Sequence, residues 1–134
     1  MKKIKSIVLV ILGLFLFMPA PVDAQVARVK IQIGSPKVRT FVYKPGHLTI
    51  RTVPNVTVVS RRSVKNGHAI VYRDRPDFIL SSYHNDFVKV GFTRVSVRKT
   101  RRTTTVIYKN GDERVRLVLR PNKKHWEAQI VAIS

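Results

Sequence analysis

The chain has 134 residues and no cysteine, and its 26 Lys and Arg against 7 Asp and Glu give a formal net charge of +19. The lack of cysteine excludes disulfides, thiolate metal sites and lipid attachment at an N-terminal cysteine. Few carboxylates are available for acid–base chemistry, whereas the excess of positive charge attracts polyanions.

The first 24 residues have the layout of a secretory signal peptide. A lysine-rich start precedes an apolar run from Ser6 to Met18, and the segment after it ends in the small residue Ala24. An uncleaved anchor is the alternative, but the run of about 13 residues is short of the roughly 20 that span a bilayer. We predict a signal peptide over 1–24 and a single basic β-domain over 25–134. The segment 1–24 holds three Lys and one Asp, which leaves 23 basic and 6 acidic side chains and a charge of +17.

The first half of this domain is predicted to form short strands. Apolar residues alternate with polar ones in several runs, and Gly, Pro and Asn separate the runs. The expected strands are Val26–Ile33, Val38–Tyr43, Leu48–Val53, Val56–Ser60 and Ala69–Tyr72. A tight turn is expected at Lys44–His47, where Pro and Gly occupy suitable positions. Arg61–Gly67 is expected to be a polar connection.

The segment Arg73–Asp86 is the least regular part of the chain. Asp77 follows a proline and would cap a single helical turn, and a short edge strand is the alternative. Phe87–Phe92 alternates and predicts a strand. Val95 and Val97 follow at odd-numbered positions, whereas the apolar side of the predicted strand has even-numbered ones. This change predicts a bulge or a turn at Thr93-Arg94.

The stretch Thr103–Ile133 predicts a three-stranded antiparallel meander. Asn110-Gly111 is expected at the centre of the first turn, because both residues tolerate positive φ, and Pro121–Lys124 is expected to form the second. The whole pattern predicts an all-β fold, a small antiparallel sandwich or barrel of about eight short strands that ends in this meander.

The two turns separate the meander into an apolar face and a basic face. The predicted register places Tyr108 opposite Glu113 and Leu119 opposite Trp126, so Trp126 is expected in the core. Tyr108 lies on the same face near the turn, where partial exposure is expected. The other face is expected to gather Arg101, Arg114, Arg116 and Arg120, with Glu127 in opposition.

The predicted ligand-binding residues are all basic: Arg98, Lys99, Arg101, Arg102, Arg114, Arg116 and Arg120. The run Arg98–Arg102 is of the kind that binds phosphate or sulfate, and it leads onto the basic face of the meander. The planar guanidinium of arginine meets such groups through two parallel hydrogen bonds. Tyrosines could add stacking on bases or sugar rings, and the candidates are Tyr43, Tyr72, Tyr83 and Tyr108.

No catalytic or metal site is predicted. Ser82, His84 and Asp86 resemble a nucleophile, a base and an orienting acid, but alternate side chains of a strand lie nearly 7 Å apart. His84 and Asp86 with another histidine could hold zinc, yet nothing in the sequence fixes their distances. We therefore expect no cofactor.

The function expected from these features is that of an exported, non-catalytic binding module in the periplasm or outside a bacterial cell. Its basic sheet face would engage anionic envelope or extracellular polymers such as lipopolysaccharide, acidic glycan or nucleic acid, or lipid headgroups. No transmembrane segment is expected after signal cleavage. The alternative is an envelope adaptor that pairs with a protein partner through a sheet edge, either Val26–Ile33 or the C-terminal strand.

Overall fold

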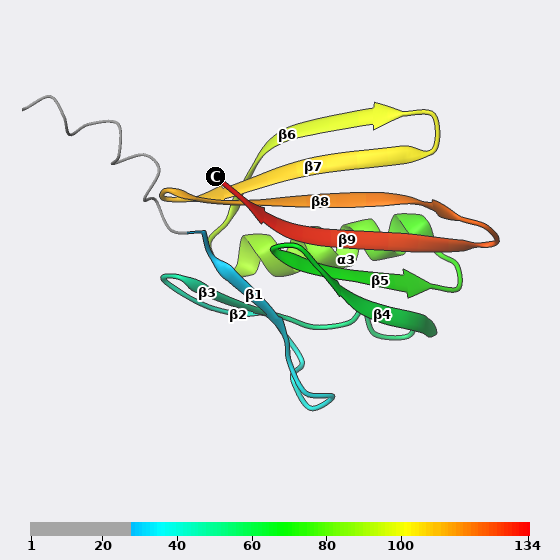
Figure 1. Cartoon of the computed structure of the whole chain (residues 1–134), viewed down its shortest axis with the longest axis horizontal. Coiled ribbons are helices and arrows are strands. Elements are labelled where there is room, and N and C mark those ends of the chain that lie inside the picture. Colours follow the sequence, from blue (N-terminus) through cyan, green and yellow to red (C-terminus); the bar gives the residue numbers. More distant parts are fainter. Residues whose placement is uncertain (1–27) are drawn as a thin grey trace, which may run out of the picture.

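The computed structural model describes residues 28–134, so the predicted signal peptide lies outside the described residues. Two sheets and one helix enclose a common hydrophobic core (Figure 1). The three-stranded sheet has the order β1-β3-β2, and the six-stranded antiparallel sheet has the order β4-β5-β9-β8-β7-β6. The predicted all-β, sandwich-like fold is confirmed. The strands of residues 28–134 form no closed barrel.

The small sheet contains β1 (Lys30–Ile33), β2 (Val42–Lys44) and β3 (His47–Ile50). β1 runs parallel to β3, and β2 runs antiparallel to it. The predicted turn between β2 and β3 is confirmed, since Lys44 pairs with His47 and Gly46 adopts φ 86°. A type II turn requires positive φ at this third position, which glycine adopts without strain.

The large sheet contains β4 (Val58–Val64), β5 (Gly67–Tyr72), β6 (Thr93–Thr100), β7 (Thr103–Asn110), β8 (Glu113–Asn122) and β9 (His125–Ile133). β4 includes most of Arg61–Gly67, which the sequence predicted to be a polar connection. The prediction was wrong because β4 is an edge strand with largely exposed side chains, so no apolar alternation marks it. The predicted irregularity near Thr93-Arg94 is confirmed as a register shift between Arg94 and Ser96.

Helix α3 (Pro76–Lys89) replaces two of the predicted features, the irregular segment and the strand Phe87–Phe92. Its buried apolar residues Ile79, Tyr83 and Phe87 recur every four residues, the period of one helix face. Gly91 ends the helix at φ 102° and donates its N–H to Val88 O over 3.0 Å. Glycine suits this position after a helix because the left-handed conformation costs it little.

The helix packs on the large sheet through aromatic contacts. The ring of Phe87 stacks on Tyr108 with centroids 4.3 Å apart, and the hydroxyl of Tyr83 hydrogen-bonds that of Tyr72. Tyr72, Tyr83 and Tyr108 are each no more than 1% exposed, so they offer no surface for stacking on a ligand. The partial exposure expected for Tyr108 is wrong. Tyr43 is half-buried, and its hydroxyl donates to Glu113 over 2.7 Å.

The register of the C-terminal hairpins differs from the predicted one by two residues. Tyr108 pairs with Val115 rather than Glu113, because Gly111-Asp112 and not Asn110-Gly111 forms the centre of the turn. Moving a two-residue turn by one position shifts each pairing by two residues and leaves every side chain on its original face. The predicted separation into an apolar and a basic face is therefore correct, although the predicted register is not.

The second hairpin shows the same shift. Trp126 pairs with Pro121 rather than Leu119, which is two residues nearer the turn between β8 and β9. It is half-buried against the core, and the guanidinium carbon of Arg102 lies 5.1 Å from its ring centroid. β9 lies between β5 and β8, so the C-terminal strand is not the open edge that the adaptor alternative requires. β1 does lie at an edge, that of the small sheet.

Candidate anion-binding sheet face

One face of the large sheet packs against α3, which lies behind the sheet in Figure 1. Successive side chains on a strand point to opposite faces, so the buried pair Leu117 and Ile130 identifies the face that meets the helix. The residues of opposite parity make up the other face, called the open face below. Its charged side chains are Arg62, Arg98, Lys109, Arg114, Arg116, Arg120 and Glu127.

Four of the seven predicted ligand-binding residues lie on the open face, namely Arg98, Arg114, Arg116 and Arg120. Lys99 pairs with the buried Thr104 and therefore belongs to the helix-side face. Arg101 and Arg102 form the turn between β6 and β7, where Arg101 adopts φ 52°. Arg101 was expected on the same face as Arg120 because β6 was not recognised as a hairpin partner of β7.

The charge on one half of the open face is partly compensated by Glu127. The Nη2 atom of Arg62 in β4 forms an ion pair with its Oε2 at 3.0 Å, and Arg120 of β8 donates from Nε to its Oε1 over 3.0 Å. Glu127 is 2% exposed, whereas the two arginine side chains are 53% and 47% exposed. The carboxylate holds two guanidinium groups in fixed positions, and the cluster retains a formal charge of +1.

The other half of the open face has no such compensation. Lys109 of β7 and Arg114 of β8 are directly paired across the strands, and Arg116 lies two residues further along β8. None of these three side chains forms an ion pair within residues 28–134. Like charges on opposed strand positions repel, so this arrangement costs stability unless an anion binds there. Lys109 was not among the predicted site residues, although its position in the alternation of β7 places it on the open face.

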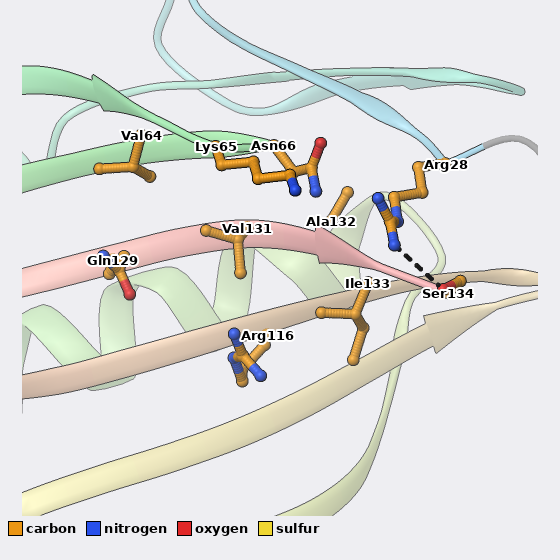
Figure 2. A pocket seen from close by; sticks show the side chains of 10 residues that line it. All are labelled: Arg28, Val64, Lys65, Asn66, Arg116, Gln129, Val131, Ala132, Ile133 and Ser134. Atoms are coloured by element: carbon orange, nitrogen blue, oxygen red, sulfur yellow. Dashed lines mark hydrogen bonds between the residues drawn. The ribbon is translucent and has the colours of Figure 1, made fainter.

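A groove of about 590 Å³ lies beside Arg116, between the end of β9 and the β4–β5 turn (Figure 2). Lys65 comes from that turn and Arg28 from the segment before β1. Apolar side chains and two amides complete the groove: Val64, Asn66, Gln129, Val131 and Ile133. Arg28 donates from Nη2 to Ser134 Oγ over 3.3 Å. Arg28 and Lys65 were not among the predicted site residues, because only the fold brings them to Arg116.

Gly67 allows the β4–β5 turn to lie close to β9. A Cβ atom on Gly67 would lie 1.9 Å from the carbonyl oxygen of Ile130, so the backbones could not approach this closely with any other residue. Asn66 adopts φ 65°, and its carbonyl oxygen accepts a hydrogen bond of 2.8 Å from the N–H of Ala132. These contacts fix the turn that carries Lys65.

The open face presents no Phe, Tyr or Trp from the six strands, since Tyr72, Tyr108 and Trp126 all have the parity of the helix-side face. Proteins that bind single-stranded nucleic acid without sequence preference stack bases on aromatic side chains. The face therefore offers charge and hydrogen bonds to an anion without a stacking platform for its bases.

The three residues that resembled a catalytic triad lie on α3, and His84 and Asp86 have other partners. Asp86 accepts two hydrogen bonds from Arg51, at 2.8 and 3.0 Å. The Nδ1 atom of His84 lies 2.8 Å from the hydroxyl oxygen of Tyr108, and burial together with the charge of Arg94 lowers the pKa of His84. The carboxylate of Asp86 is therefore engaged by arginine and does not orient the imidazole.

Within residues 28–134, no group of three or more His, Cys, Asp or Glu side chains is arranged to hold a metal ion. In the same part of the chain, no helix has the length and apolar character needed to cross a membrane. Comparisons of the chain with protein-family models, curated proteins and solved structures gave no match.

Proposed function

We propose that this protein is an exported, non-catalytic binding module for anionic polymers of the bacterial envelope or its surroundings. The observation that carries the proposal is the uncompensated group Lys109, Arg114 and Arg116 on the open face, continuous with the groove beside Arg116. The proposal of export rests on the charge and hydropathy pattern of residues 1–24.

Binding would occur through several phosphate, sulfate or carboxylate contacts at once. Exposed arginine and lysine side chains on a rigid sheet meet successive anionic groups, and each contact releases a counterion from the polymer. The field of the whole domain would also accelerate encounter with a polyanion. Affinity should therefore fall steeply as salt increases.

The test is a salt series with protein expressed as the full chain, using lipopolysaccharide, a sulfated glycan and double-stranded DNA. The double variant Arg114→Gln/Arg116→Gln removes two charges from the open face. The matched control Lys44→Gln/Lys89→Gln removes two exposed charges from β2 and α3.

We expect the open-face variant to weaken binding about tenfold or more at low salt and to reduce the slope of log affinity against log salt. The control should change both values much less. Equal losses in the two variants would mean that net charge alone drives binding. If the wild-type protein bound none of the three polymers but captured one protein partner at high salt, the adaptor alternative would be favoured.

A further inference from the structure

We propose that the groove beside Arg116 binds a single phosphomonoester group carried by a sugar ring, such as a phosphorylated unit of an envelope glycan. This inference rests on the proposed function and specifies the chemistry of one subsite within it. The groove differs from the rest of the open face in being concave and in drawing its cations from three separate segments.

The charge in the groove suits a dianion. Arg28, Lys65 and Arg116 contribute a formal charge of +3, and no Asp or Glu side chain lines the groove. None of the three cations forms an ion pair within residues 28–134. A phosphomonoester carries about −1.5 to −2 charges at pH 7 and three acceptor oxygens, so it can be met by more than one cation at once.

Figure 2 shows how these side chains are distributed. Lys65 and Asn66 lie on one side of the end of β9, and Arg116 lies on the other, with Arg28 near the end of the strand. Because the three cations come from different sides, they can contact different oxygens of one phosphate group that lies over the end of β9. A long extended polymer would instead follow the rows of charge across the strands of the open face.

The remaining lining suits a sugar ring. Val64, Val131 and Ile133 present apolar groups to the C–H face of a ring, while the amides of Asn66 and Gln129 can exchange hydrogen bonds with hydroxyl groups. The volume of about 590 Å³ lies within the range of small-molecule sites. The groove has no aromatic side chain in its lining, so it offers no stacking surface to a nucleobase.

The test is a titration of the full chain with glucose 6-phosphate, inorganic phosphate and glucose as separate probes. Binding is followed by NMR shifts of the backbone amides of Asn66, Gly67, Gln129 and Ala132. We expect saturable shifts at these amides with glucose 6-phosphate, weaker binding of inorganic phosphate, and no binding of glucose at the same concentration.

Two variants locate the anion. Lys65→Gln and Arg116→Gln should each weaken the binding of glucose 6-phosphate by about tenfold, as expected for loss of one charge-assisted hydrogen bond. Lys89→Gln removes an equal charge from the exposed end of α3 and should leave the affinity within about twofold. Folding of each variant is checked from its amide spectrum.

Three results would overturn the inference. These are shifts spread evenly over all basic residues of the sheet, equal affinity for inorganic phosphate and glucose 6-phosphate, and equal weakening by Lys89→Gln. If lipopolysaccharide or sulfated glycan still bound with a steep salt dependence in such a case, the proposed function would stand and only the subsite would fail. Loss of binding to every polymer in the salt series would instead contradict the proposed function itself.

Discussion

Arg51 and Asp86 form an ion pair through two hydrogen bonds, from Nε to Oδ2 over 2.8 Å and from Nη2 to Oδ1 over 3.0 Å. Their side chains are 16% and 5% exposed. Arg51 directly follows β3 of the small sheet, and Asp86 lies in the last turns of α3. The pair therefore joins the small sheet to the helix that packs on the large sheet.

Substitution of Asp86 by Asn should destabilise the protein by about 3 kcal/mol, because the guanidinium of Arg51 would be left largely buried without a counter-charge. Asp77→Asn is the matched control, since Asp77 is exposed in the first turn of the same helix and should cost less than about 1 kcal/mol. Urea unfolding of both variants gives the comparison. Similar losses in the two would show that the pair contributes nothing beyond a surface charge.

The contact between His84 and Tyr108 predicts a dependence of stability on pH. Burial, and then the charge of Arg94, lowers the pKa of His84, so the unfolded chain takes up a proton more readily than the folded protein. The stability that His84 provides is present above about pH 6.5 and is lost as pH falls through the lowered pKa. A doubly protonated imidazole has no acceptor, so protonation would also leave the His84 ring able only to donate to the Tyr108 hydroxyl.

The measurement is the free energy of unfolding of wild-type and His84→Gln protein between about pH 7.5 and pH 5.5. Glutamine retains an acceptor for Tyr108 and does not titrate. Wild-type stability should fall more steeply over this range than that of the variant. Parallel curves would show that His84 has the same proton affinity in the folded and unfolded chains.

The sequence predicted the strand-rich class and the two faces of the meander, because alternation and turn residues are local signals. It offered at most a single helical turn in place of α3, although Ile79, Tyr83 and Phe87 recur at helical spacing and Gly91 follows. The alternation of apolar residues in Phe87–Phe92 was a competing local pattern. The predicted strand was wrong because so short a segment fits both the two-residue period of a strand and the 3.6-residue period of a helix. Packing against the large sheet selects the helix.

The candidate site was only partly predictable. The arginines on β8 follow from strand parity, which is why Arg114, Arg116 and Arg120 were assigned to one face before the fold was known. Lys65 and Arg28 lie far from Arg116 in the sequence, and no local pattern relates them. Their approach depends on the order of strands in the sheet, which strand patterns alone do not give.

Gly67→Ala should destabilise the protein by more than about 2 kcal/mol, since the added Cβ would collide with the backbone of β9 and could be accommodated only by moving the strand. Gly111→Ala is an informative comparison, because nothing lies within 4 Å of its Cβ position and only its φ of 63° opposes the change. That strain should cost about 1 to 2 kcal/mol. If Gly67→Ala proved the milder change, close approach of β5 and β9 would not be what requires glycine.

Glu127→Gln should have opposite effects on stability and on ligand affinity. The substitution removes the buried charge between Arg62 and Arg120 and leaves their repulsion uncompensated, so stability should fall by about 2 kcal/mol at low salt and by less at high salt. The same change raises the formal charge of the cluster from +1 to +2, so a polyanion that crosses the open face should bind more tightly.

Glu113→Gln separates these two effects. Glu113 accepts hydrogen bonds of 2.7 Å from the Tyr43 hydroxyl and from the N–H of Gly46, so its loss should also destabilise the protein. Its side chain has the parity of the helix-side face, so the charge it removes lies away from the open face. Affinity for a sulfated glycan should rise in Glu127→Gln and change little in Glu113→Gln. An equal rise in both would show that the polymer responds to net charge and does not contact the open face.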